Sequence, residues 1–365
     1  MIRLYRRQTP SGFWVFMAPV VALVLTLLSG LVLFSLLGVP VTAAFYAFFI
    51  EPLTSTYGLA ELGVKAAPLI MIGVALSVCF RAGVWNIGAE GQLIVGAICG
   101  GAVALHFADV DAFWVLPLMM LAGTAGGMLW AAIPALLRTG FNTNEILTSL
   151  MLTYVASLLL GYMVVGPLRD PFGFNFPQSA LFHDAALLPI IWPTTRLHIG
   201  FIVALILVVL VWLVMSRTLL GFGLLVSGAA PRAGRFAGFS VARSVWISLL
   251  FSGGIAGLAG LFEVAGPIAQ LLPNISPGYG FTAIIVAFVG RLHPFGVLFA
   301  GLLLALSYLG GESAQISLNL PVAVTGVFQG LLLFFLLATD VLIHYSLKPL
   351  RSLPDTLSES GRSLS

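Results

Sequence analysis

Residues 80–92 read FRAGVWNIGAEGQ, and they lie between two long apolar segments. The stretch gathers an arginine, an asparagine, a glutamate and a glutamine in a chain of which only 8% is charged. Its three glycines, at positions 83, 88 and 91, weaken any continuous helix here. Interrupted backbone at membrane depth is tolerated only where protein buries it or where it lines a wet cavity. The stretch is therefore the first candidate for a translocation pathway.

The composition of the whole chain predicts a membrane protein. Of its 365 residues, 60% are hydrophobic and 8% are charged, whereas about 25% of an ordinary soluble domain is charged. The 40 glycines and 20 prolines suit packed and interrupted membrane helices. Cys79 and Cys99 fall in apolar segments without metal-ligand spacing, and we expect them to be buried spectators. The expected fold class is an all-α polytopic membrane protein of about ten transmembrane helices, with broken segments and a weak two-half repeat.

Ten spans result when each crossing is given about 20 residues. The eighth is short because Arg291, His293 and Pro294 interrupt it, and the first is interpreted as a retained helix rather than a signal peptide. The expected spans are 13–37, 62–80, 91–107, 113–137, 146–166, 199–216, 244–265, 281–290, 294–310 and 321–343.

The basic residues predict the orientation of these spans. With the N-terminus in the cytoplasm, 13 of the 16 lysines and arginines lie inside, and only Lys65, Arg169 and Arg196 lie outside. The opposite orientation would invert this bias, so the positive-inside rule predicts that both termini are cytoplasmic.

The chain reads as one transmembrane domain, residues 1–348, followed by a polar, serine-rich cytoplasmic tail, residues 349–365, that we expect to be disordered. The proline-rich segment 167–198 is expected to be an ordered external loop, and 217–243 is the longest cytoplasmic connection inside the bundle.

Small residues four apart permit close helix packing, and they occur as Gly96/Gly100, Gly123/Gly127, Gly253/Gly257 and Gly326/Gly330.

A short internal repeat accompanies the opening stretch. Residues 86–89 read NIGA and residues 274–277 read NISP, and each set precedes an expected helix after the second span of its half. Transporters built from structural repeats place interrupted segments at corresponding positions around the binding site. The repeat therefore adds Asn274 to the candidates for the pathway.

The motifs of enzymes and primary pumps are missing from the sequence. A phosphate-binding loop needs G-x-x-x-x-G-K-[ST], yet the two lysines, Lys65 and Lys348, are followed by alanine and proline. Neither H-E-x-x-H nor G-x-S-x-G occurs, and the five histidines are dispersed. We expect no catalytic residues, no metal site and, because the basic residues are scattered, no nucleic-acid partner.

Five motifs in order resemble the permease subunits of bacterial ABC importers of the simple-sugar and branched-chain amino-acid type. The likeness covers roughly residues 60–340 and is strongest to the nucleoside branch, which works with a Bmp-type binding lipoprotein. The motifs are NIGAEGQ at 86–92, NTNEI at 142–146, RAGRFAGF at 232–239, PGYGF at 277–281 and GRLHPFG at 290–296.

The resemblance implies a bacterial inner-membrane protein that pairs with a second permease subunit, as a homo- or heterodimer. It also implies a cytoplasmic ATPase subunit that carries the ATP and Mg²⁺, an extracytoplasmic substrate-binding lipoprotein, and no cofactor on this chain. The connection 217–243 corresponds to the coupling region where the ATPase docks, and its candidate docking residues are Arg232, Arg235, Phe236, Gly238 and Phe239. Pro231 departs from the family's smoother lead-in and leaves the start of the coupling helix open. From the residues alone, the same segment could instead be a basic loop that binds membrane lipid.

The expected cargo is a small polar solute, most readily a nucleoside, with a simple sugar as the alternative. A nucleoside has a flat base and a ribose, so aromatic rings could contact its face while amides bind its hydroxyls. The candidate pathway residues are Phe80, Trp85, Asn86, Glu90, Gln92 and Asn274.

Glu90 has two interpretations. A carboxylate inside the membrane is a functional candidate, but at a helix start it can also interact with the helix dipole or pair with Arg81. Asn144 and Glu145 are expected to cap the fifth span or to contact the ATPase, and Glu263 is expected to lie at the outer rim. Two rivals to the importer remain, namely a secondary transporter that uses Glu90 for ion coupling and a membrane scaffold that transports nothing.

Overall fold

The computed structural model describes residues 2–6, 12–321 and 323–349. These residues divide into two units, one from the chain ends (up to Val41 and from Ala323) and one from Thr42–Val322. Each unit is described by itself. The tail expected to be disordered lies outside the described residues beyond Pro349.

The terminal unit is a helix pair with a short ribbon. Helix α1 (Gly12–Leu36) packs on α13 (Ala323–His344), and β1 (Ile2–Arg6) pairs antiparallel with β2 (Tyr345–Pro349). The Phe34 and Phe328 rings lie 5.4 Å apart between the two helices, and a Cβ at Gly30 would overlap the Phe328 ring. Aromatic contact at a small residue therefore holds this pair together.

The second unit is helical almost throughout. Seven helices of the described chain are long and apolar enough to cross a membrane, which confirms the all-α polytopic fold. In chain order the elements are α2 (Val41–Phe45), η1 (Tyr46–Ile50), η2 (Glu51–Leu53), α3 (Thr56–Arg81), α4 (Ala89–His106), α5 (Val115–Phe141), α6 (Glu145–Val165), η3 (Asp184–Ala186), α7 (Gly200–Arg217), α8 (Leu219–Ala229), α9 (Pro231–Phe236), α10 (Val241–Glu263), η4 (Val264–Ile268), α11 (Tyr279–Val289) and α12 (Pro294–Leu318).

Each of the ten expected spans coincides with a helix, but the boundaries need correction. Helix α3 begins at Thr56 rather than at 62, and α12 continues to Leu318 rather than 310. Helix α8 was not expected, because its sequence falls within the connection 217–243. Its 11 residues span only about 16 Å, well short of a bilayer core of about 30 Å, so it is no additional crossing.

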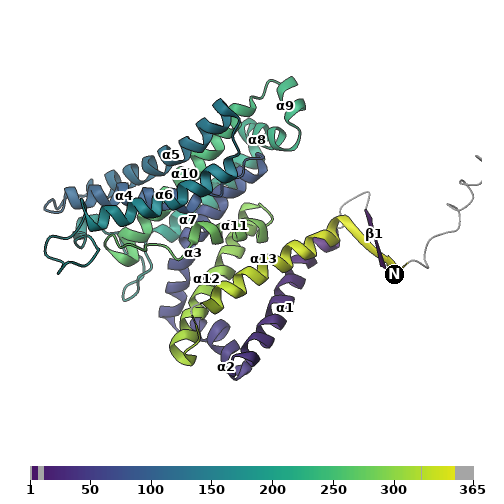
Figure 1. Ribbon diagram of the computed structural model, residues 1–365, viewed down its shortest axis with the longest axis horizontal. Helices are drawn as coiled ribbons and strands as arrows, with labels where there is room; N and C mark the ends of the chain where they lie inside the picture. The colour runs from purple at the N-terminus through teal and green to yellow at the C-terminus, as the bar shows by residue number, and fades with distance from the viewer. Residues whose placement is uncertain (1, 7–11, 322, 350–365) are drawn as a thin grey trace, which may run out of the picture. The chain divides into compact units, whose positions relative to one another are not determined.

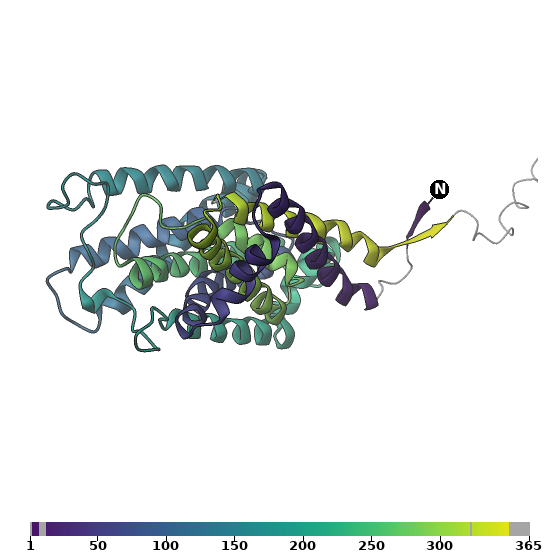
Figure 2. The same cartoon turned by 90° about the horizontal axis from the view of Figure 1, so that it is seen from below.

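Glycines bring α4, α5 and α10 into backbone contact. Figures 1 and 2 show these helices side by side, together with α6. A Cβ on Gly257 of α10 would lie 2.9 Å from the Cα of Gly127 on α5 and would overlap the carbonyl of Gly123, and Gly96 of α4 packs on the same glycine. Three of the four expected glycine pairs are therefore confirmed as tight contacts. Gly326 and Gly330 make no such contact within the terminal unit.

The segment 167–198 is ordered, as expected, and its backbone bonds to the chain that follows α10. The amide of Ser179 donates to Leu271, and those of Phe182 and Leu188 donate to Ala269 and Ala265, each at 2.9 Å. These bonds join the loop to residues 265–271, which lie just before α11.

Two side chains fix the end of this loop. Arg196 donates from Nε and Nη2 to the two carboxylate oxygens of Glu61 at 2.8 and 2.6 Å, a bidentate pair that favours arginine over lysine. His198 is 3% exposed beside Phe262, and burial lowers its pKa to about 4, so the ring is neutral at physiological pH.

We predict that Gly257→Ala destabilises the protein by about 1–3 kcal/mol, because its Cβ meets backbone that cannot move aside. Gly161→Ala on α6 is the matched control, since no described atom lies within 4 Å of its Cβ and alanine favours a helix by about 0.5–1 kcal/mol. Thermal unfolding in detergent measures both variants. Equal melting temperatures for the two would contradict the packing of α4, α5 and α10.

Candidate functional site

The break between α3 and α4 is held by a buried amide. Asn86 is fully buried, and its Nδ2 donates to Gln92 Oε1 at 2.9 Å and to Ser252 Oγ of α10 at 2.8 Å. Its Oδ1 accepts from Gln92 Nε2 and from the Gly88 amide, both at 3.1 Å. Asn86 and Gln92 therefore use their polar atoms on each other, on Ser252 and on the backbone.

The glycines of this break serve close packing. A Cβ on Gly91 would lie 2.8 Å from the Cα of Thr153, and one on Gly88 would lie 2.7 Å from the carbonyl oxygen of Ser149. Both neighbours belong to α6, so the start of α4 touches the α6 backbone. Gly83 has φ +69, a left-handed conformation that turns the chain after α3 and favours glycine.

Phe80 and Trp85 form an aromatic cluster with Phe288 of α11. The ring centroids lie 5.3 Å apart for Phe80–Trp85, 5.1 Å for Phe80–Phe288 and 6.0 Å for Trp85–Phe288. Phe80 is 8% exposed and Trp85 is 42% exposed. The cluster thus packs α3, the break and α11 together, with Trp85 at its open edge.

An ion pair between α5 and α6 also binds the backbone of the break between α3 and α4. Arg138 Nη1 lies 2.5 Å from Glu145 Oε1, which also accepts from the Trp85 amide at 3.3 Å. Arg138 Nη2 donates to the carbonyl of Gly83 at 3.3 Å. Asn144 caps α6 through the Ile146 amide at 2.9 Å, as expected, whereas Glu145 holds the break.

A second break, residues 269–278, separates η4 from α11. The chain that follows it contacts the start of α4 at Glu90. Ser276 Oγ accepts from the amides of Gly278 and Tyr279 just before and at the start of α11. The Gly280 amide donates to Glu90 Oε2 at 2.6 Å, and a Cβ at Gly280 would lie 2.5 Å from the Cα of Glu90. One carboxylate therefore faces the N-terminal ends of both α4 and α11, which supports the dipole interpretation of Glu90. No described ion pair joins it to Arg81.

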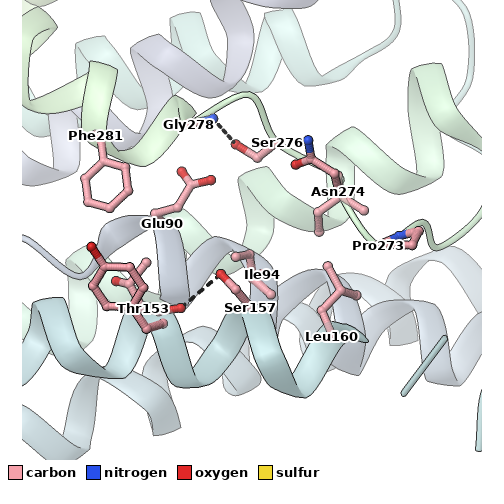
Figure 3. Close-up of a pocket in the computed structure, with 12 residues that line it drawn as sticks. Glu90, Ile94, Thr153, Ser157, Leu160, Pro273, Asn274, Ser276, Gly278 and Phe281 are labelled. Carbon is pink, nitrogen blue, oxygen red and sulfur yellow. Dashed lines mark hydrogen bonds between the residues drawn. The ribbon is translucent and has the colours of Figure 1, made fainter. Parts of the chain in front are cut away.

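A cavity of about 290 Å³ lies between the second break, α4 and α6. Figure 3 shows Thr153 and Ser157 of α6 across from Ser276 and Asn274, with Glu90 between them. Its wall consists of Glu90, Ile94, Thr153, Tyr154, Ser157, Leu160, Pro273, Asn274, Ile275, Ser276, Gly278 and Phe281. Of the six expected pathway residues, the structure places Glu90 and Asn274 at this cavity and the other four outside it.

The wall includes hydroxyls that the sequence analysis missed. Thr153 and Ser157 are four residues apart on α6, in line with Ser149, and this spacing puts all three on one helix face. A stripe of hydroxyls in an apolar span is the signal that could have identified them. In the described part of the chain, no three His, Cys, Asp or Glu side chains converge as a metal site would require.

The expected coupling region forms α8 and α9, with Pro231 at the first turn of α9, where its fixed φ suits a helix. Phe239 packs inward, with its ring 5.9 Å from that of Phe222 and against Gly223. Phe236, by contrast, is 95% exposed, and Arg232, Arg235 and Gly238 are exposed beside it.

Helix α8 also packs on the first break. A Cβ at Gly228 would lie 2.7–2.8 Å from the backbone at Ala82 and Gly83, so only glycine allows this approach. The Ser244 hydroxyl of α10 donates to Ser227 Oγ at 3.0 Å and fixes α8 from the other side. The exposed α9 surface is therefore one helix away from the break that carries Asn86.

Comparison with known proteins matches residues 58–337 to the family model for the permease component of branched-chain amino acid transport systems. The chain belongs to this family. Its members supply the membrane part of a transporter, which agrees with the seven apolar helices described above.

Individual relatives of this permease cover nearly the whole chain. It is 38% identical to the glucose ABC transporter permease protein TsgB13 of Haloferax volcanii, over 94% of this chain and 93% of that protein. It is 31% identical to the guanosine ABC transporter permease protein NupP of Bacillus subtilis, over 87% and 92%. It is 27% identical to the nucleoside permease protein NupB of Lactococcus lactis, over 88% and 90%. The chain is therefore a multi-pass permease component of an ABC importer, which is a transport subunit.

Substitution of two asparagines compares the buried network of the first break, which contains Asn86, with the cavity wall, which contains Asn274. We predict that Asn86→Ala lowers stability by about 1–3 kcal/mol, because it leaves buried partners on Gln92 and Ser252 unsatisfied. Asn274→Ala, at an exposed position of the cavity wall, is expected to change stability by less than about 0.5 kcal/mol. Thermal unfolding of the two purified variants tests this, and an unchanged melting temperature for Asn86→Ala would refute the buried network.

Proposed function

We propose that this permease translocates nucleosides across the bacterial inner membrane, using ATP hydrolysed on a separate subunit. The supporting observation is the cavity where the two broken segments meet. It combines the carboxylate of Glu90, the amide of Asn274 and the hydroxyls of α6 with the ring of Phe281. Transporters of repeat construction bind their substrates at such interrupted segments.

A nucleoside fits this combination of groups. Its ribose hydroxyls and base edges can bond to Asn274, Ser157 and the free edge of Glu90, while Phe281, 39% exposed, offers a ring to the flat base. The volume of about 290 Å³ lies at the lower end of small-molecule sites, which begin at about 300 Å³. Modest affinity suits a permease, because a tight site would retain the solute that the binding protein delivers.

A simple sugar is the second candidate, and the 38% identity to a glucose permease favours it. Sugar hydroxyls would use the same carboxylate, amide and hydroxyl groups. The two candidates differ at Phe281, because a sugar has no extended flat ring to lie against it.

The test is uptake in cells from which this chain has been deleted, with labelled guanosine and labelled glucose supplied in parallel. We expect guanosine uptake to fall to background and to return with the wild-type chain, but to return only partly with Asn274→Ala. Loss of glucose uptake alone would replace the nucleoside assignment by the sugar. Uptake of both solutes unchanged would refute both assignments.

The proposed partners are a cytoplasmic ATPase, a second permease and an extracytoplasmic binding lipoprotein. In this arrangement both termini and the end of the bundle that carries α8 and α9 face the cytoplasm, as the basic residues predict. Coupling then passes from α9 through α8 to the break at Ala82 and Gly83, where Gly228 makes its close contact. ATP and Mg²⁺ belong to the ATPase subunit, and this chain needs no cofactor of its own.

Docking of the ATPase is tested at the exposed surface of α9. We predict that Arg235→Glu and Phe236→Ala each abolish co-purification of the ATPase with the tagged permease, because the first reverses one of the two positive charges of α9 and the second removes its exposed ring. Phe172→Ala is the matched control, an equally exposed ring (87%) on the loop 167–198. Undiminished co-purification with Phe236→Ala would refute the docking surface. A wild-type chain that purifies alone and transports under an ion gradient would support the secondary transporter instead.

A further inference from the structure

Two adjoining cavities form a groove along α7, α8 and α10, away from the candidate pathway. The first, of about 310 Å³, is lined only by apolar side chains, among them Val78, Leu207, Val211, Met215 and Phe251. The second, of about 370 Å³, continues from it past Leu220, Leu224 and Ile247, which line both. We call the two together the α7–α8–α10 groove.

The mouth of this groove is polar and basic. Arg243, Ser240 and Ser244 line the second cavity, and no carboxylate lines either one. Arg243 is exposed in the first turn of α10 and makes no ion pair with any described carboxylate. An N-terminal helix turn adds positive potential at the same point. The groove thus has an apolar interior and a cationic entrance.

We propose that the α7–α8–α10 groove binds an anionic phospholipid, with an acyl chain in the apolar cavity and the phosphate at Arg243. A free phosphate would leave the apolar cavity unused, whereas a lipid satisfies both parts. The groove is open toward the surface of the bundle, because Leu210 is 51% exposed and Leu220 is 47% exposed. Its entrance lies where α7 ends at Arg217 and α10 begins, the depth at which a headgroup meets the end of a span.

The leaflet follows from the proposed orientation, which places Arg243 on the cytoplasmic side, where the anionic surface attracts basic residues. The lipid would contact one face of α8, while Gly228 of the same helix packs on the break at Ala82 and Gly83. A bound lipid therefore supports the helix that lies between the coupling surface and the pathway, and this consequence rests on the proposed function.

The test uses the complex purified with its partners in mild detergent and a phosphatidylglycerol probe with a photoactivatable acyl chain. After illumination, peptide mapping is expected to place the adducts on residues 207–224 and 243–251. Unlabelled phosphatidylglycerol should compete at least about tenfold better than phosphatidylcholine of the same chain length, equivalent to about 1.4 kcal/mol. Equal competition by the two lipids would overturn the assignment of Arg243 to the phosphate.

Two variants separate the two parts of the groove. Arg243→Gln should abolish the preference for phosphatidylglycerol, and Leu210→Trp should reduce labelling by either lipid because it fills the apolar cavity. Arg169→Gln is the control, an arginine of the loop 167–198 that lines neither cavity. An equal effect of Arg169→Gln would overturn the proposal in favour of general surface charge. Labelling of the isolated chain that disappears in the assembled complex would assign the groove to a subunit interface. None of these readouts depends on which solute is transported.

Discussion

The hydrogen bond from the Gly280 amide to the Glu90 carboxylate is the contact on which the arrangement of the two breaks depends. It requires the backbones of α4 and α11 to approach so closely that Gly280 has no room for a Cβ. Both helices present their N-terminal ends to this carboxylate, and no described ion pair involves it. Helix α11 has only 11 residues, and the irregular chain before it leaves the opening that becomes the cavity.

Around this contact, some helices pack closely through glycines, whereas others leave space between them. Helices α4, α5 and α10 touch through glycine backbones, and their separation cannot change without breaking several close contacts at once. Helix α6 touches the start of α4 through Gly88 and Gly91 but moves away from the second break, where Thr153 and Ser157 face the cavity. The cavity thus lies between α4, which is held by its contacts with α5 and α10, and the separate wall that α6 provides.

The sequence predicted the features that follow from composition and helical spacing, namely the spans, the two breaks, the Asn144 cap and three of the four glycine pairs. It could not predict which way a side chain points where the backbone is irregular. Asn86 and Glu90 are four residues apart, yet one turns to Ser252 and the other to Gly280, because the chain between them is not helical. Inward packing of Phe239 depends on its contacts with Phe222 and Gly223 of α8, which no local pattern contains.

The three backbone hydrogen bonds between the loop 167–198 and residues 265–271 make these two segments one mechanical body. Residues 273–278, which belong to the cavity wall, follow directly on that body. We expect a displacement of the loop to reach the cavity wall through these backbone bonds, since the same chain continues from residue 271 to residue 273. Arg196, paired with Glu61, holds the end of the loop against α3.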